Sequence, residues 1–507
     1  MPCSLLLKNA NVITLNAGQP RAKLVAVDGD SIFFTGDNSE VERLTGRDTK
    51  VIDCEGKTVM PGFNDAHLHL FSLLKKLLSV DLTNARSNED IKKAVRKQAL
   101  KIPPGNWISC TDYNEFYLGE KRCPTRWDLD EAAPDHPVIL SHRSLHACVL
   151  NSMALSLAGI TKDTPEPPGG RIERDLNTGE PNGILIDMIS LIRSGVMPPL
   201  SDKEINKGLK LLNKLLLSNG LTSVQDATVR NGMARWEAVC GFVLNQQIQS
   251  RVTFMAGNDY WHDFQSREVK TGSGDNLMQL GAVKFLVEVE HDQKLLNEQV
   301  LECHRAGWQI ALHAIAESSI ATAVTALENA SKHSPTAGRR HRIEHCVECT
   351  SELMTRIKKL DVVIDTHPGN LYYSGERYLA TVDKNQLPWL YRIKSPLAAG
   401  INLAFASDAP VISVNPLVGI YGAVARLAEN GQELLPEERI GVMQALQCYT
   451  FGGAYASFED KIKGSLAPNK LADMIILSGD PLATPPEKLK DIKVEKTIIG
   501  GEVVWER

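Results

Sequence analysis

Two histidines one residue apart, His67 and His69, stand in the short segment "VMPGFNDAHLHL" at residues 59–70. In an extended strand, the side chains of residues i and i+2 lie on the same face. Two imidazoles on one face at the end of a strand can bind a single metal ion, because imidazole nitrogen is a common ligand of zinc and related divalent ions. The same spacing also fits two ordinary surface residues, so other parts of the chain must decide between these interpretations.

Further side chains with ligand chemistry stand in or after later apolar runs. Lys284 lies in "GAVKFLVEV", His313 in "WQIALHAIA", His345 in "HRIEHC" and Asp408 in "INLAFASDAP". Taken alone, each has an ordinary explanation: a histidine can be a hydrogen-bonded polar residue, a lysine a solvated charge and an aspartate a turn former. Taken together they favour a metal site, because independent accidents would not all fall at the C-terminal ends of strands.

The apolar runs alternate with helix-like segments such as "INKGLKLLNKLLLSNG", which is typical of parallel sheets covered on both faces. Eight β/α units predict an α/β fold with a closed TIM-type (β/α)8 barrel, whose active site lies at the C-terminal ends of the strands. We expect the strands to be the one that ends at His67 and those at residues 221–227, 251–257, 281–289, 308–316, 341–346, 361–368 and 401–410.

The two ends of the chain have a different pattern, in which short apolar runs alternate with turns. Residues 1–60 contain "KLVAVDGDSIFFTGD" and residues 461–507 contain "KTIIGGEVVWE", with glycine turns typical of hairpins. We expect these segments to form one small composite β-sandwich, which leaves residues 61–460 as the barrel domain. Residues 71–219 are too long for one β/α connection, so we expect an insertion over the barrel mouth that shapes the substrate pocket.

The composition is that of an ordinary globular protein, with 43% hydrophobic and 23% charged residues. The net charge is 56 − 61 = −5 and no basic block occurs, which argues against nucleic acid or a membrane surface as the main partner. The first segment, "MPCSLLLKNANVITL", predicts a strand and not a signal peptide. Ten scattered cysteines favour reduced thiols in a cytoplasmic protein. The predicted partner is therefore a small-molecule substrate, and a homo-oligomer is left open.

The order H-x-H, Lys, His, His, Asp over a β/α barrel with a split sandwich resembles that of the amidohydrolase superfamily. More narrowly, the chain resembles amidohydrolase family three, the group that includes N-substituted formamide deformylases. The similarity extends over nearly the whole chain, through "VMPGFNDAHLHL", "LHACVLNSMALSLAGI", "GLTSVQDA", "RIEHC", "SDAPV" and "GSLAPNKLADMIIL". Whereas "HLH" alone would be a weak signal, these motifs together are specific.

The resemblance implies two divalent metal ions, for which zinc is expected. His67 and His69, together with Asp408, would hold a more buried ion, and His313 and His345 would hold a second one. A divalent metal lowers the pKa of a bound water toward ~7, so that hydroxide can attack an amide-like carbonyl at neutral pH. As the catalytic residue, Asp408 would accept the proton of that water and pass it to the departing amine.

Lys284 would bridge the two ions as a carbamate formed with carbon dioxide, according to the same resemblance. A free ammonium has no lone pair for a metal, whereas its carbamate offers two oxygens. Family members often have Asp-Gly four residues after this lysine, where this chain has Glu288 and Val289, so the longer carboxylate of Glu288 could itself reach the metals. His367, at the end of the seventh strand, could orient a substrate carbonyl or could be structural.

Candidate substrate contacts lie in the insertion. Family members commonly have Asp-Gly-His where this chain has Ser144, Leu145 and His146, so only the histidine of that motif is kept. The neighbouring His142 and Arg143 could bind a substrate carboxylate, or they could be solvated loop residues.

These features predict a metal-dependent hydrolase that cleaves an amide-like carbon–nitrogen bond other than a peptide bond. A deaminase of the same superfamily would use one metal and attack a ring carbon, and Lys284 argues for two metals instead. A lactonase or esterase would need the same site, and only the pocket could distinguish it. A non-catalytic barrel scaffold is the remote alternative, and such a protein would purify without stoichiometric metal.

Overall fold

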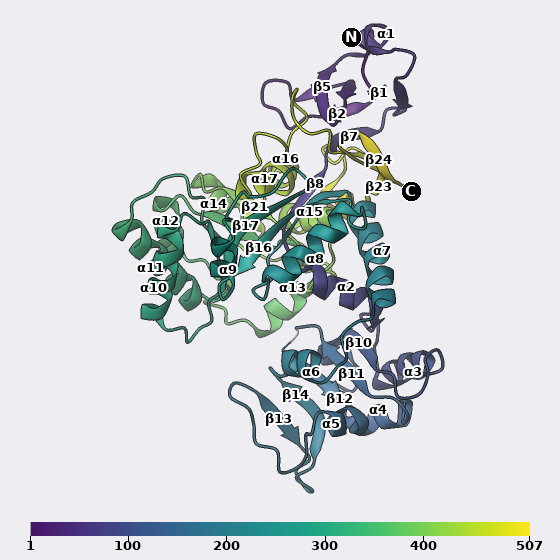
Figure 1. Cartoon of the computed structure of the whole chain (residues 1–507), viewed down its shortest axis with the longest axis vertical. Helices are drawn as coiled ribbons and strands as arrows, with labels where there is room; N and C mark the ends of the chain where they lie inside the picture. Colours follow the sequence, from purple (N-terminus) through teal and green to yellow (C-terminus); the bar gives the residue numbers. More distant parts are fainter. Residues whose placement is uncertain (1, 145) are drawn as a thin grey trace. The chain divides into compact units, whose positions relative to one another are not determined.

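The computed structural model, which describes residues 2–144 and 146–507, contains a closed barrel of parallel strands (Figure 1). Its eight strands follow one another around the barrel in chain order. The Asp408 N–H donates to the His67 carbonyl oxygen at 2.8 Å, and this bond joins the last strand to the first. The predicted (β/α)8 barrel is therefore confirmed. The strands are β8 (Phe63–Leu68), β15 (Leu221–Asp226), β16 (Arg251–Gly257), β17 (Met278–Leu286), β18 (Ile310–Ala314), β19 (Arg342–His345), β20 (Val363–Thr366) and β21 (Leu403–Phe405).

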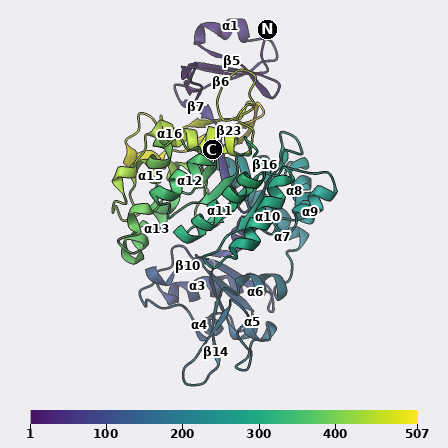
Figure 2. The same ribbon diagram turned by 90° about the vertical axis from the view of Figure 1, so that its left-hand side faces the viewer.

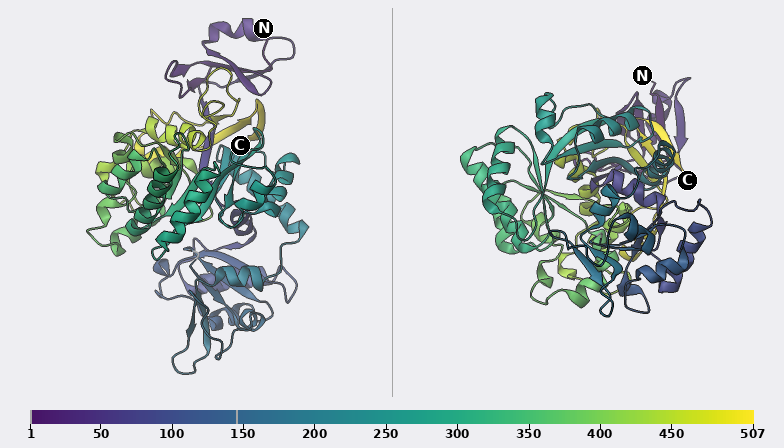
Figure 3. Two further views of the ribbon diagram at one scale, coloured as in Figure 1. Left: turned by 60° about the vertical axis from the view of Figure 1, so that its left-hand side comes forward. Right: turned by 60° about the horizontal axis from the view of Figure 1, so that its bottom comes forward.

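Helices follow the strands and cover the outside of the barrel (Figure 3). In α10, for example, Leu296, Val300 and Cys303 lie about one turn apart and are all buried, while the Asp292 side chain caps the first turn. Within the described residues, no helix combines the length and apolarity that crossing a membrane requires. The covering helices include α8 (Met233–Leu244), α9 (Trp261–Ser266), α10 (Gln293–Arg305), α11 (Glu317–His333), α12 (Ser351–Lys359), α13 (Gly369–Thr381), α15 (Pro416–Ala425), α16 (Val442–Gln447) and α17 (Gly453–Ala456).

Strands from both ends of the chain share one sheet, in the order β24-β23-β22-β7-β2-β3 (Figure 2). A second sheet, in the order β5-β4-β1-β6, contains N-terminal strands only. The apolar core of this region joins Val12 and Val25 from the N-terminal segment to Met474 and Ile498 from the C-terminal one. The strands are β1 (Leu5–Lys8), β2 (Asn11–Ile13), β3 (Arg21–Ala22), β4 (Leu24–Asp28), β5 (Ser31–Gly36), β6 (Lys50–Asp53), β7 (Thr58–Pro61), β22 (Met474–Leu477), β23 (Val494–Ile499) and β24 (Glu502–Glu506).

Residues Leu70–Leu212 form a compact unit with a six-stranded sheet of its own, in the order β13-β14-β12-β11-β10-β9. Successive strand residues face opposite sides, so Val138 and Leu140 pack in one apolar core and Ile139 packs in another. The insertion is therefore a layered structure and not only a long loop. Its strands are β9 (Val80–Asp81), β10 (Ile108–Tyr113), β11 (Val138–His142), β12 (Ala147–Leu150), β13 (Arg171–Arg174) and β14 (Pro181–Ile186), and its helices include α2 (Leu70–Leu78), α3 (Asn88–Ala99), α4 (Arg126–Ala132), α5 (Ser152–Leu157) and α6 (Ile189–Gly195).

Candidate metal centre

The predicted metal ligands lie together at the C-terminal ends of the barrel strands. The ring centroid of His67 lies 5.3 Å from that of His69 and 5.0 Å from that of His345. The ring of His313 lies 4.3 Å from the ring of His345. Lys284 approaches from β17, with its Nζ 3.4 Å from Nε2 of His67. The parallel strands of the barrel thus bring side chains that are far apart in the sequence to one rim.

The Asp408 carboxylate lies between these imidazoles. Its Oδ1 is 3.2 Å from Nε2 of His69 and 3.7 Å from Nε2 of His67, and its Oδ2 is 3.9 Å from Nδ1 of His345. Burial opposes ionisation, but the neighbouring His69, His367 and Lys284 hold the pKa of Asp408 below its usual range. The carboxylate is therefore ionised at neutral pH, and it can bind a cation or accept a proton.

Backbone strain accompanies this geometry. His345 and Asp408 have positive φ angles of 70° and 56°, in the left-handed region. Such a conformation costs a residue other than glycine on the order of 1–3 kcal/mol, and it persists where the surroundings impose it, often at functional sites. His345 and Asp408, which bring an imidazole and a carboxylate to the cluster, therefore both have strained backbones.

The tautomer of His67 is fixed by a buried carboxylate beneath it. Nδ1 of His67 lies 2.5 Å from Oε2 of Glu344, which also accepts from Nη2 of Arg342 at 3.0 Å. Burial raises the pKa of Glu344, but Arg342 and Lys284 outweigh it and keep that pKa below its usual range. Because an ionised carboxylate can only accept, Nδ1 of His67 carries the proton and Nε2 keeps a lone pair for a metal.

The tautomer of His69 is fixed in the same way by a hydroxyl. The Thr228 hydroxyl donates to Oδ1 of Asp226 at 2.6 Å, so its oxygen is an acceptor toward Nδ1 of His69 at 3.0 Å. Nδ1 of His69 therefore donates, and Nε2 keeps its lone pair on the side of Asp408. Outer partners of this kind orient metal-binding histidines in proteins.

Burial also sets the protonation of the other groups. It lowers the pKa of His313 to about 3 and that of His345 well below the usual value, so both rings are neutral and can bind a metal. Burial likewise lowers the pKa of Lys284, although neighbouring carboxylates oppose the effect. A lower pKa raises the fraction of neutral amine, which is the form that reacts with carbon dioxide.

This donor set fits a divalent metal ion. One ligand atom each from His67, His69 and Asp408 lies within 4.8 Å of the other two. Neutral imidazoles and an ionised carboxylate are the ligands that zinc and related ions take in proteins. The cluster therefore offers the types of ligand atom that a divalent ion takes.

Comparison with known proteins agrees with this site. A sequence model of the amidohydrolase family matches residues 50–505, which is most of the chain. The chain belongs to the amidohydrolase family. The N-substituted formamide deformylase of Arthrobacter pascens is 30% identical over 538 residues, which cover 99% of this chain and 98% of that protein. The protein LONG AFTER FAR-RED 3 of Arabidopsis thaliana is 27% identical over 538 residues, which cover 99% of this chain and 91% of that one.

The fold also matches a solved structure. The crystal structure of an uncharacterized metal-dependent hydrolase from Pyrococcus horikoshii superposes with a TM-score of 0.76 and 22% identity, over 95% of this chain and 99% of that one. The resemblance predicted from the motifs is confirmed by the family match. This amidohydrolase is accordingly a metal-dependent enzyme that hydrolyses carbon–nitrogen bonds.

Several buried residues of the amidohydrolase site were missed in the sequence. Arg342 and Glu344 lie two positions apart on β19, and Asp365 lies on β20 with its Oδ2 3.4 Å from Nδ1 of His67. The period of two along a strand could have revealed Glu344, because it places Arg342 and Glu344 on one face and Ile343 on the other. The motif "RIEHC" thus carries two site residues, Glu344 and His345.

The predicted substrate contacts of the insertion have partners within their own unit. Nδ1 of His146 lies 2.8 Å from Oδ1 of Asp187, and its side chain is 76% exposed. Nε2 of His142 lies 3.0 Å from Oε2 of Glu115. Arg143 is partly buried, and its backbone N–H donates to the Tyr113 carbonyl oxygen at 3.0 Å. Leu145, the replaced residue of the family motif, lies outside the described residues.

Glu288 and His367 have opposite environments. The strand expected at residues 281–289 is shifted, since β17 spans Met278–Leu286. Glu288 therefore follows the strand and is exposed. His367 is fully buried, and its ring centroid lies 5.1 Å from that of His67 and 4.5 Å from that of His345.

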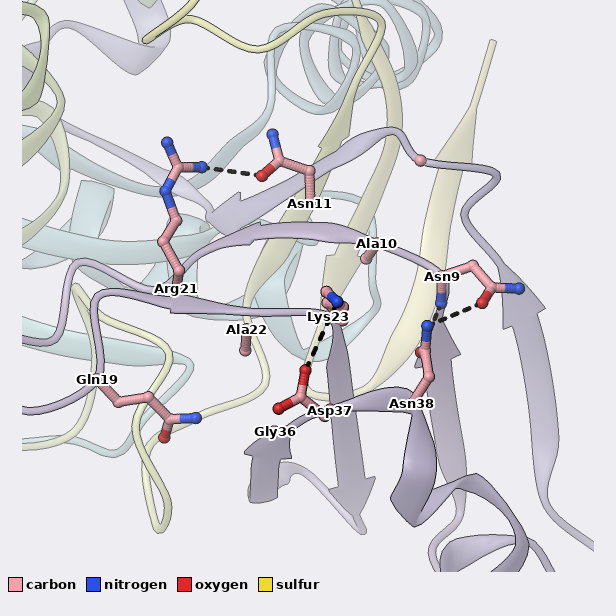
Figure 4. Close-up of a pocket in the computed structure, with 11 residues that line it drawn as sticks. Asn9, Ala10, Asn11, Gln19, Arg21, Ala22, Lys23, Gly36, Asp37 and Asn38 are labelled. Carbon is pink, nitrogen blue, oxygen red and sulfur yellow. Dashed lines mark hydrogen bonds and ion pairs between the residues drawn. The ribbon is translucent and has the colours of Figure 1, made fainter.

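A cavity of about 680 Å³ lies on the sandwich (Figure 4). The residues that line it belong to another part of the sequence than the metal cluster. Several of its polar side chains are paired with one another. Nη1 of Arg21 donates to Oδ1 of Asn11 at 2.9 Å, and Nδ2 of Asn38 donates to Oδ1 of Asn9 at 2.9 Å. The cavity contains no histidine, so it is not the site of the metal chemistry.

Proposed function

We propose that this amidohydrolase cleaves the amide bond of a small N-acyl amine and uses two zinc ions. His67, His69 and Asp408 would hold one ion, and His313 and His345 would hold the other. The observation that carries the proposal is the position of Asp408, whose two oxygens lie within 4 Å of His69 and of His345, one from each group. The relative that is named a deformylase of N-substituted formamides supports an N-acyl amine as the substrate class.

Lys284 completes this centre as a carbamate. The neutral amine attacks the carbon of carbon dioxide and loses one proton, and the product is an anion with two oxygens. Nζ lies 3.4 Å from Nε2 of His67, inside the cluster, so the new oxygens would stand among the ligands. The low exposure of Lys284, 2%, favours the neutral amine that this reaction requires.

Asp408 holds and moves the proton. A bound divalent ion lowers the pKa of water toward ~7 and polarises the carbonyl of the substrate. Asp408 is ionised and central, so it can accept the proton of the attacking water. The same carboxylic acid can then protonate the departing amine, which is a poor leaving group until it is protonated.

The test combines metal analysis with a substrate panel. The purified enzyme should contain two zinc ions per chain, lose activity to a chelator and regain it with zinc. N-formyl and N-acyl amines should be hydrolysed faster than matched esters, lactones or aminopurines. A preparation with one ion and activity on an aminopurine would indicate a deaminase, and preference for lactones would indicate an esterase. A protein that retains no metal would be a scaffold.

We also propose substrate contacts, a location and a class of partner for this enzyme. His146 and Arg143 are candidates for substrate contact from the insertion, whereas the exposure of Glu288 argues against a role at the metals. The cysteines of the described residues are free thiols and mostly buried, which supports a reducing, cytoplasmic location. We propose a small molecule as the partner, with no role for nucleic acid or a membrane, and leave a homo-oligomer open.

A further inference from the structure

His367 is fully buried at the rim of the barrel. It follows β20, at the C-terminal end of the seventh barrel strand, and its exposed fraction is 0%. Neither ring nitrogen has a hydrogen-bond partner among the residues that the structure describes. Buried imidazoles in proteins are normally paired, since an unpaired polar group loses its hydration without compensation. The ring of His367 therefore has at least one nitrogen that is open to a partner other than a protein group.

The location of His367 indicates what that partner is. One ring nitrogen each from His67, His345 and His367 lies within 4.8 Å of the other two. The ring of His367 is thus as close to these two ligands as they are to each other, with centroids at 5.1 Å and 4.5 Å against 5.0 Å. Three imidazole nitrogens that converge in this way can bind one metal ion together.

A buried carboxyl group, that of Asp365, lies beside the ring of His367. Oδ2 of Asp365 lies 3.5 Å from Nε2 of His367 and 3.4 Å from Nδ1 of His67. His67 already donates its proton to Glu344, at the shorter distance of 2.5 Å. Asp365 is therefore available to orient the ring of His367 from the Nε2 side. Carboxylates orient metal-binding histidines in this way.

We propose that His367 is an additional imidazole ligand of the metal centre, on the side where His67 and His345 meet. The inference rests on the proposed function, because it requires that the centre holds metal. It changes the expected role of His367 from a contact to the substrate carbonyl into a contact to the metal. It also gives the centre one more neutral ligand than the six residues of the predicted set supply.

The first experiment measures metal affinity in variants of the full chain. His367→Gln keeps a polar side chain of similar length but removes the imidazole, and His304→Gln is the matched control. His304 is also buried, but its Nδ1 and Nε2 pair with His341 and the Ser334 carbonyl oxygen. Competition with a chelator should show Co²⁺ or Zn²⁺ affinity reduced at least ~10-fold in His367→Gln, the scale of losing even an outer partner. The control should keep the wild-type affinity.

A second measurement does not depend on the folding of a variant. Crystals of the wild-type enzyme grown with Co²⁺ should give an anomalous peak about 2.1 Å from a ring nitrogen of His367, the usual metal–imidazole distance. A peak more than 3 Å away, or unchanged affinity in His367→Gln with only a higher KM, would overturn the proposal and make His367 a substrate contact. In both cases the wild-type chain would still bind metal, so the proposed function would stand. Failure of the wild-type chain to bind any divalent metal would overturn both.

Discussion

The two ends of the barrel both bury histidines, but they satisfy them differently. At the N-terminal end, Nδ1 of His341 accepts from the Ile310 N–H at 3.1 Å, and Nε2 of His341 meets Nδ1 of His304 at 2.8 Å. Nε2 of His304 donates to the Ser334 carbonyl oxygen at 2.7 Å. Each nitrogen of this pair therefore has a protein partner. At the C-terminal rim, His67 and His69 use Nδ1 on Glu344 and Thr228, and their Nε2 atoms face groups of the metal cluster instead, Lys284 Nζ at 3.4 Å and Asp408 Oδ1 at 3.2 Å.

This difference separates structural histidines from ligands better than burial does. A closed chain of hydrogen bonds fixes both tautomers of the pair at the N-terminal end and leaves no lone pair for a ligand. At the rim, Glu344 and Thr228 fix one nitrogen and leave the other open toward Asp408. The same amino acid thus stabilises the fold at one end and is available for chemistry at the other.

The largest effect is expected from removing both histidines of the first strand. The double substitution His67→Ala with His69→Ala should abolish metal retention and activity while the barrel remains folded. Mass spectrometry would measure the metal content, and circular dichroism would show whether the barrel remains folded. The substitution His304→Ala should do the reverse, with reduced thermal stability and full metal content. A double variant that kept full metal content would contradict the site.

A smaller loss is expected from Asp408→Asn, which separates metal binding from proton transfer. Asparagine keeps the shape of the side chain and can offer an oxygen to a metal, but it cannot accept the proton. We expect kcat to fall by ~10²–10⁴ with metal content largely intact. If excess zinc restored the rate, Asp408 would be a ligand only. An unchanged rate with metal present would remove Asp408 from the mechanism.

The contrast between the two ends also explains how much the sequence could predict. Apolar runs indicated the eight strands, and parallel strands end at one rim, so His313, His345 and Asp408 could be grouped without coordinates. The left-handed backbones of His345 and Asp408 could not be predicted, because they arise from packing at the rim. The hydrogen-bond partner of each histidine nitrogen could not be predicted either, because these partners come from other parts of the barrel.

The insertion was harder to predict for a different reason. Its strands are short, and some carry little apolar signal, such as β13 with the sequence "RIER" and β9 with two residues. Their pairing is also mixed, with β10 parallel to β11 and β11 antiparallel to β12. Short strands with distant partners depend on tertiary contacts more than on local pattern. The length and proline content therefore indicated an insertion but not its sheet.

A moderate effect on metal affinity is expected from Glu344→Gln. The substitution removes the charge that holds Nδ1 of His67 and leaves Arg342 without its ionised partner. Outer partners of metal ligands typically change affinity by ~10–100-fold, so zinc should bind that much more weakly. The matched control is Glu459→Gln, a buried carboxylate whose Oε2 lies 2.6 Å from Nζ of Lys463. Equal affinities in the two variants would show that Glu344 has no particular role.

The smallest effect on the metal centre is expected from the ion pair at the opposite end, Arg251 with Asp473. Nε of Arg251 donates to Oδ2 of Asp473 at 2.6 Å, and both side chains are 5% exposed. The pair links the first residue of β16 to the segment just before β22, so it connects the barrel to the C-terminal strands.

Asp473→Asn should therefore lower stability and leave the metal centre intact. Removing one charge from a buried pair typically costs about 3–5 kcal/mol, because the other charge stays buried without its partner. Asparagine keeps one oxygen for Arg251, so we expect the lower end of that range, measured by urea unfolding. Glu502→Gln is the control, because its pair with Lys50 is about 70% exposed and should leave the unfolding midpoint unchanged. Zinc affinity should equal that of the wild type in both variants. A loss of affinity in Asp473→Asn at temperatures where it is fully folded would mean that the two ends of the barrel are coupled, and that satisfied polar groups also shape the site.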